Sequence, residues 1–343
     1  MTGRDSARAL GAGVAMALAV TAAHGTDDAG WKPMGFAQLT MEQRGDGGID
    51  FGADRVRAGA RFSAGDFGGG LVLDFNVPDA GDRTPGTLTN VIKDVYGDWR
   101  FHPRWLLRVG QFKTPLGMDF NTPGHRLDIT KRGMEKPLVL ERDPGAMVSG
   151  RGLPGGFGVD AGAFNPAGRS GATTHTTAQE GEDNAYAGRL HWDGVEALHA
   201  EIAYGTSEAA GGPGTEDYRV LDAGLRFTRG PLTLKAEWID GSDIRGIDGR
   251  DERVVYGHAD YRLSQRWTLV ARHYAGRSEP ATGGDSNLGN TYLGVTVHPP
   301  MRGPVVLRLQ INAVLESGDG EAYTGLGGFR DDAVLVQAQV ALR

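Results

Sequence analysis

Three arginines on one short segment are the residues of this sequence best placed to do chemistry. Residues 54–63 alternate between apolar and polar side chains, and the polar positions include Arg55, Arg57 and Arg61. Because successive side chains of a β-strand point to opposite faces, the three guanidinium groups share one face. Guanidinium groups form paired hydrogen bonds with phosphate and carboxylate oxygens. Three like charges would repel each other in a dry core, so we expect this face to meet water and to attract anions.

Cations occupy the polar face of other segments as well. In Val305–Leu315, Arg308 shares its face with Gln310 and Asn312, opposite a row of apolar side chains. Across all such faces the basic residues outnumber the acidic ones, although the whole chain has a formal net charge of -7 at pH 7. A polar surface with an excess of cations concentrates anions. The predicted pore-lining residues are Arg55, Arg57, Arg61, Arg108, Arg272 and Arg308.

The elements that must position these arginines are about sixteen alternating segments, joined by links that are in turn long and short. Gln43–Ala53 and Gly276–Asn290 are examples of predicted long links, and Gly230–Pro231 is a short one. A closed antiparallel barrel with loops at one rim and tight turns at the other has this rhythm, whereas a soluble β-sandwich does not require it. We therefore predict an all-β transmembrane antiparallel β-barrel of about 16 strands, with short periplasmic turns and long extracellular loops.

The interior of such a barrel is predicted to be polar throughout and filled with water. Sixteen strands would enclose an aqueous lumen, because side chains alone cannot fill a barrel of that diameter. Aromatic residues near the segment ends, among them Trp31, Trp267 and Tyr292, are expected to form girdles at the membrane interfaces. These patterns point to a channel in an outer membrane.

The beginning of the chain predicts export. Arg4 and Arg8 precede the apolar stretch Leu10–Ala23, which is too short to span a bilayer as a helix, and a small-x-small cleavage site follows at residues 23–25. We interpret residues 1–25 as a signal peptide and residues 26–343 as one barrel domain. The chain has no cysteine, which suits passage through an oxidising periplasm. The predicted location is the outer membrane of a Gram-negative bacterium.

Catalytic and cofactor motifs are not supported by the sequence. Gly150–Gly155 matches GxGxxG, but Pro154 and the absence of a following helical pattern make it a turn. The nine histidines lack HExxH spacing, Asp240–Asp251 lacks the ligand order of a calcium loop, and no GxSxG elbow occurs. The sequence therefore predicts no enzyme, no cofactor, no metal site and no nucleic-acid partner.

Several stretches together resemble a known family. Val95–Phe120, with the core LRVGQFKTPLG, looks like a strand, a tight turn and a strand end that leads into a long loop. Asp128–Gly133 (DITKRG) and Leu140–Gly150 (LERDPGAMVSG) look like the end of that loop and the returning strand. The combination resembles the phosphate-selective porin O and P family. Weak similarity covers most of the mature chain, and its specific core is Arg108–Gly117.

The resemblance implies a sixteen-stranded, usually trimeric porin whose loop after the fifth strand folds into the lumen as a constriction. In this sequence that loop is Lys113–Asp143, the longest link of the chain, and we expect it to form the constriction. The predicted constriction residues are Lys113, Arg126, Lys131 and Arg132. The implied function is passive diffusion of small hydrophilic solutes with weak selectivity for anions such as phosphate. Implied partners are membrane lipid, lipopolysaccharide, further copies of the chain in a homotrimer and the barrel-assembly machinery.

Two alternatives remain open at this stage. A barrel plugged by its long loops could serve as a surface receptor or scaffold, and an outer-membrane barrel hydrolase with an exposed Ser-His pair is less favoured. The chain also ends in Leu342-Arg343, without the terminal aromatic residue that the insertion machinery usually reads.

Overall fold

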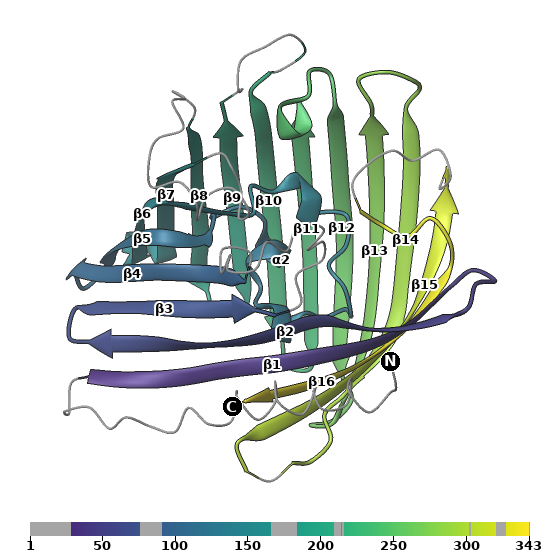
Figure 1. Cartoon of the computed structure of the whole chain (residues 1–343), viewed down its shortest axis with the longest axis horizontal. Coiled ribbons are helices and arrows are strands. Elements are labelled where there is room, and N and C mark those ends of the chain that lie inside the picture. The colour runs from purple at the N-terminus through teal and green to yellow at the C-terminus, as the bar shows by residue number, and fades with distance from the viewer. Residues whose placement is uncertain are drawn as a thin grey trace, which may run out of the picture.

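Sixteen strands form one closed antiparallel barrel (Figure 1). The computed structural model describes residues 29–75, 91–165, 184–208, 214, 216–301, 303–319 and 327–342, so the predicted signal peptide, residues 1–25, lies outside the described residues. The predicted fold class is confirmed. The strands are β1 (Ala29–Arg44), β2 (Ile49–Ala64), β3 (Phe67–Asp74), β4 (Ile92–His102), β5 (Trp105–Lys113), β6 (Arg142–Leu153), β7 (Phe157–Phe164), β8 (Ala185–Val195), β9 (Leu198–Ser207), β10 (Tyr218–Arg229), β11 (Leu232–Ser242), β12 (Asp251–Arg262), β13 (Trp267–Glu279), β14 (Ser286–Val297), β15 (Val305–Gly318) and β16 (Ala333–Leu342).

Each strand pairs with its neighbours in the chain, and β1 closes the ring by pairing with β16. Closure removes the free sheet edges that would otherwise leave backbone groups unpaired in lipid. The predicted alternation holds in β15, where Arg308, Gln310 and Asn312 are buried inside. Ile311 and Leu315 of the same strand are exposed on the outside, as expected for a surface that meets lipid.

The predicted long link Gln43–Ala53 is wrong. β1 continues to Arg44 and β2 begins at Ile49, so only a tight turn separates the two strands. Gly45 at this turn has φ 47, a conformation that glycine adopts at little steric cost. Glycine and acidic residues near the turn gave the impression of a loop, but the strand pairing persists through them to Gln43 and Ile49.

The link between β5 and β6 lies inside the barrel, as predicted, and is called the inserted loop (residues 114–141) below. It contains α2 (Met118–Asn121) and the short 3-10 helices η1 (Gly124–Arg126) and η2 (Lys136–Leu138). The barrel wall holds it through side-chain hydrogen bonds to its backbone, among them Gln38 Nε2 to Gly124 O at 3.0 Å and Gln339 Nε2 to His125 O at 3.1 Å. In Figure 1, α2 is seen within the ring of strands. Among the described residues, no helix is long and apolar enough to cross a membrane.

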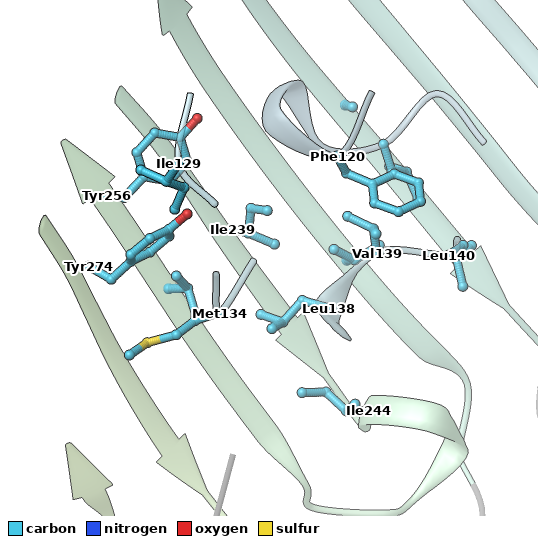
Figure 2. Packing of buried hydrophobic residues seen from close by; sticks show 14 of the residues in the cluster. Phe120, Ile129, Met134, Leu138, Val139, Leu140, Ile239, Ile244, Tyr256 and Tyr274 are labelled. Atoms are coloured by element: carbon cyan, nitrogen blue, oxygen red, sulfur yellow. The ribbon is translucent and has the colours of Figure 1, made fainter. Parts of the chain in front are cut away.

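The interior is not polar throughout, which corrects the sequence prediction. Apolar residues of the inserted loop, such as Met134 and Leu138, pack against inward-facing Ile239, Tyr256 and Tyr274 of the wall (Figure 2). The loop excludes water from this part of the lumen, so apolar side chains are stable there. Tyr292 belongs to the same cluster and is fully buried, so its predicted place in an interfacial girdle is wrong. Trp31 and Trp267 are exposed, with 59% and 48% of their surface accessible.

Candidate functional site

An open part of the lumen runs beside the inserted loop, as a cavity of about 430 Å³. Its cationic lining comes mainly from the inward faces of β2, β4, β5, β6 and β8, and we call these ten residues the basic wall. Among the described residues, the acidic side chains in the lining are Asp94 and Asp160. The basic wall consists of Arg57, Arg61, Lys93, Arg100, Arg104, Arg108, Lys113, Arg142, Arg151 and Arg189.

Two carboxylates of this region each face two cations. Asp74 Oδ2 lies 3.0 Å from Arg57 Nε and 3.0 Å from Lys93 Nζ. Asp160 lies 2.6 Å from the Arg151 guanidinium and 2.8 Å from that of Arg189. The lining holds ten cationic side chains and two acidic ones, so it carries a net positive charge. The lumen beside the inserted loop is therefore basic although the whole chain has a formal net charge of -7.

The guanidinium groups of the basic wall differ in how firmly they are held. Arg108 forms two hydrogen bonds with Asp98, at 2.7 and 2.9 Å, and stacks over the Tyr96 ring at 3.9 Å. Arg61, Arg100 and Arg104 are exposed to the cavity and form no ion pair with any residue that the structure describes. Their charges are therefore available to a solute.

Lys93 was missed by the sequence analysis. The register between β3 and β4 shifts at a bulge next to Leu73, and both Lys93 and the adjacent Asp94 reach the lumen. A bulge breaks strict alternation, so a side chain that alternation assigns to the outside can turn inward. Strict alternation would place Lys93 on the lipid-facing surface. Because a lysine is unfavourable there, its position could have indicated that the strand is bulged and that Lys93 points inward.

The structure separates the four predicted constriction residues. Lys113 lines the cavity, and its ammonium group donates to the carbonyl oxygens of Phe120 and Thr122. Lys131 forms an ion pair with Glu42 of β1, and Arg132 donates to carbonyl oxygens within the inserted loop itself. Arg126 is exposed and forms no ion pair within the described part of the chain.

Three predicted pore-lining arginines instead lie against the inserted loop or its supports. Arg272 is fully buried, 3.0 Å from Asp119 and 3.2 Å from Asp128. Arg308 donates to the carbonyl oxygen of Leu127 at 3.1 Å. Arg55 donates to Gln38 Oε1 at 2.7 Å, and Gln38 in turn holds the loop. These side chains point inward, but they bind protein.

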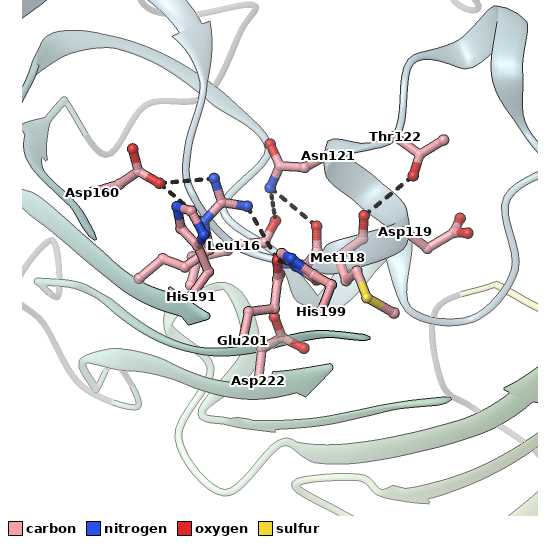
Figure 3. Close-up of polar contacts among 12 residues, drawn as sticks. Leu116, Met118, Asp119, Asn121, Thr122, Asp160, His191, His199, Glu201 and Asp222 are labelled. Carbon is pink, nitrogen blue, oxygen red and sulfur yellow. Dashed lines mark hydrogen bonds and ion pairs between the residues drawn. The ribbon is translucent and has the colours of Figure 1, made fainter. Parts of the chain in front are cut away.

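Carboxylates hold the loop on the opposite side of the lumen. Glu237 accepts hydrogen bonds from the backbone N–H groups of Met118 and Asp119, at 2.7 and 3.0 Å, and Asp222 accepts one from Gly117 at 3.1 Å. Figure 3 shows Asp222 and Glu201 on the strands next to α2. We call the inward face of β10–β16, with the inserted loop packed on it, the covered wall.

The electrostatics of the loop follow from burial and from these neighbours. Burial alone would raise the pKa of the Asp119 carboxyl, but Arg272 and Arg132 outweigh it and lower the pKa below its ordinary value. Burial and the charge of Asp119 raise the pKa of Glu135 to about 7. The pKa of His125, which faces the basic wall, is lowered by burial and by nearby arginines, first among them Arg126.

A second cavity of about 250 Å³ adjoins the first beneath α2. The two cavities share Asn121 and Pro123 of the inserted loop and Arg189 of β8 in their linings, so these residues stand between them. A solute that passes from one cavity to the other would have to move past these residues.

Two groups of side chains in the described residues have the geometry to hold a metal ion, although the sequence predicts none. One is His191, Asp193 and His199 on the β8–β9 hairpin, and the other is Asp128, His258 and Asp260. The sequence analysis missed the first group because it looked for HExxH, a motif that places its histidines on a helix. The signal of this group is a pair of alternating patterns, His-x-Asp on one strand and His-x-Glu on the next, separated by a short turn.

The closed barrel, its lipid-facing apolar surface and its polar cavities define an outer-membrane channel. The Gram-negative porin family matches residues 119–294, more than half of the chain, and the chain belongs to that family. It is a porin of the Gram-negative outer membrane, a channel for passive diffusion. No curated protein sequence matches the chain.

Solved structures with low sequence identity share the fold. The outer-membrane protein OmpT of Vibrio cholerae is 12% identical, with a TM-score of 0.64 over 93% of this chain and 99% of that one. A trimer form of OmpT is 12% identical, with a TM-score of 0.66 over 92% and 100%. An anion-selective porin from Comamonas acidovorans is 13% identical, with a TM-score of 0.63 over 92% and 99%. Salmonella typhi OmpF, in complex with daunomycin, is 10% identical, with a TM-score of 0.65 over 93% and 99%.

Proposed function

We propose that this porin is weakly selective for small hydrophilic anions and that the basic wall sets the preference. The observation that carries the proposal is the imbalance of charge beside the open cavity. The cavity lining holds ten cationic side chains and two acidic ones, and Arg61 and Arg100 have no acidic partner among the described residues. Cations on a channel wall raise the local concentration of anions and lower that of competing cations.

Phosphate and similar oxyanions are the solutes that suit this wall. Guanidinium groups match the oxygens of phosphate in pairs, and an exposed arginine loses little hydration when it meets one. The resemblance of Arg108–Gly117 and its flanks to the phosphate-selective porin O and P family supports the same class of solute. In this proposal the inserted loop forms the constriction, and Lys113, which lines the open cavity, is its cation.

We also propose how the chain matures and assembles. Residues 1–25 would be removed as a signal peptide after export, leaving 26–343 as the barrel domain. A homotrimer is proposed by analogy with the trimer form of OmpT, surrounded by membrane lipid and lipopolysaccharide after insertion by the barrel-assembly machinery.

Single-channel recording of the refolded mature protein in planar bilayers tests the proposal. In a tenfold gradient of potassium chloride we expect discrete steps and a reversal potential of the sign that denotes anion preference. Phosphate added to the chloride solution should reduce the current. The triple variant Arg61→Gln, Arg100→Gln, Arg104→Gln should lower the anion-to-cation permeability ratio at least twofold, because it removes three unpaired charges from the cavity.

Arg253→Gln is the matched control, because Arg253 is exposed outside the basic wall and pairs with Asp240 at 2.7 Å. It should leave the permeability ratio unchanged. Cation preference of the wild-type channel, or a triple variant with unaltered selectivity, would overturn the proposal. A correctly folded barrel that gives no steps would favour the plugged receptor or scaffold.

A further inference from the structure

Four side chains with metal-binding chemistry share the inner face of the β8–β9 hairpin. His191 and Asp193 alternate on β8, and His199 and Glu201 alternate on β9, with His191 directly opposite Glu201. Both histidines turn an Nδ1 toward the same carboxylate. His191 Nδ1 lies 3.1 Å from Asp193 Oδ2, and His199 Nδ1 lies 2.7 Å from Asp193 Oδ1.

The ligand atoms of His191, Asp193 and His199 lie within 4.8 Å of one another, close enough for one transition-metal ion to bind all three. With metal–ligand bonds of about 2.0–2.1 Å in a tetrahedral arrangement, ligand atoms lie about 3.3 Å apart. The His191 ring packs over Gly158 of β7, where a Cβ would come within 2.1 Å of Nε2. Only a residue without a side chain leaves room there, and the ring keeps its Nδ1 edge toward Asp193. The ligand atoms are therefore close together before any ion arrives.

Glu201 completes the arrangement from behind. Its Oε2 lies 2.9 Å from His199 Nε2, so the proton on that nitrogen is fixed and Nδ1 is left as the metal-facing atom. The Glu201 side chain is only 2% exposed, and its Oε1 has no hydrogen-bond partner in the described part of the chain. A carboxylate behind a ligating histidine is the usual support in metal sites.

Charge and access also permit a cation at this place. The nearest arginines, Arg151 and Arg189, are engaged by Asp160 and, for Arg189, also by Glu201. The Asp193 side chain is 51% exposed, so an ion can reach it. His199 and Glu201 line the second cavity, so the site can be reached from the lumen.

We propose that His191, Asp193 and His199 bind one divalent transition-metal ion of the Zn²⁺ type at the periplasmic mouth of the lumen, with Glu201 as the positioning residue for His199. The β8–β9 turn lies at the rim where β1 begins and β16 ends, together with the other short turns, which is the periplasmic rim of such barrels. The ion takes the place of the proton shared by His199 Nδ1 and Asp193, and that proton passes to the buffer.

The second cluster shows why geometry alone is insufficient. Asp128 already forms an ion pair with Lys235 and another with Arg272 at 3.2 Å. His258 Nδ1 accepts a hydrogen bond from Arg272 Nε at 3.2 Å. Two protein cations occupy the position that a metal would need, so this cluster is part of the covered wall and not a metal site.

Calorimetric titration of the refolded barrel with Zn²⁺ at pH 7.4 tests the proposal without depending on ion conduction. One ion per chain should bind. Because binding releases a proton to the buffer, the measured heat should depend on which buffer is used. Co²⁺ should give the visible absorption of a four-coordinate nitrogen and oxygen site. Mg²⁺ should not compete, because it prefers six oxygen ligands. The double variant His191→Gln, His199→Gln should bind Zn²⁺ at least 100-fold more weakly.

Glu201→Gln should weaken Zn²⁺ binding about 10- to 100-fold and leave the stoichiometry unchanged, as expected for a residue behind a ligand. His273→Gln is the matched control, because His273 is exposed on β13, away from the site, and its side chain is hydrogen-bonded to Thr291 at 2.9 Å. Circular dichroism and heat modifiability confirm that each variant folds. Zn²⁺ affinity equal in the wild type and the double variant would overturn the site and leave His199 as a salt-bridge partner of Asp193 and Glu201.

Discussion

The two walls of the lumen are built from the same alternating strands, yet they differ in what meets their inward side chains. On the basic wall, Arg61 and Arg100 face an open cavity and have no acidic partner among the described residues. On the covered wall, Arg272 is fully buried between Asp119 and Asp128 of the inserted loop. The comparison teaches that an inward arginine stays open to the lumen or becomes a structural anchor according to whether the inserted loop reaches it.

The largest expected effect is on the covered wall. Arg272→Ala removes the fully buried cation that Asp119 and Asp128 share, and breaking a buried ion pair costs about 3–5 kcal/mol. We expect a marked fall in the thermal unfolding midpoint, followed by heat modifiability on gels, and noisier single channels as the loop loosens. Arg100→Ala on the basic wall is the control. Equal stability of the two variants would break the distinction between the walls.

Removing an apolar contact between loop and wall should have the next largest effect. Met134 is completely buried in the lumen cluster, so Met134→Ala should destabilise the barrel by about 2–5 kcal/mol through lost contacts and the cavity left behind. Met301 is 41% exposed in a periplasmic turn, and Met301→Ala should change little. Denaturant unfolding of both variants provides the measurement. If the two variants lost similar free energy of unfolding, the apolar contacts between the inserted loop and the barrel wall would not stabilise the protein.

A smaller effect depends on pH. The pKa of Glu135 is raised to about 7 from its ordinary value of 4.5, first by burial and then by Asp119. Between these pH values the unfolded chain releases the proton and the folded chain keeps it, so this group's contribution to stability falls as pH rises. The contribution becomes constant only once the pH is well above 7, where the folded chain has also released the proton. Glu135→Gln should therefore gain stability relative to the wild type between pH 5 and pH 8 in thermal unfolding. A constant difference across that range would contradict a buried, neutral Glu135.

The smallest effect on stability is expected on the basic wall. Arg61→Gln should change the free energy of unfolding by less than about 0.5 kcal/mol, as is usual for an exposed side chain without special contacts. The same variant should shift the reversal potential toward zero, because the charge faces the solute. Parallel measurements of unfolding and of reversal potential sharpen the comparison. Lost stability with unchanged selectivity would place Arg61 among the anchors.

Much of the architecture could be predicted from the sequence alone. Alternation with a period of two assigned Arg308, Gln310 and Gln337 to the inside, because a barrel in lipid must separate its two faces residue by residue. The length of the β5–β6 link indicated the loop able to enter the lumen, and the strands end and resume at Lys113 and Arg142. These features depend on local pattern and on the solvent on each side.

The tertiary structure decided which inward residues remain open. Lys131 was predicted to face the solute, but Glu42 lies close enough to pair with it only because β1 closes the ring against β16. Lys93 reached the lumen through a bulge that alternation cannot foresee. His191 and His199 meet at Asp193 because a hairpin aligns them. The sequence determined the side of the wall for most residues, whereas strand register and loop packing determined their partners, since those contacts join positions far apart in the chain.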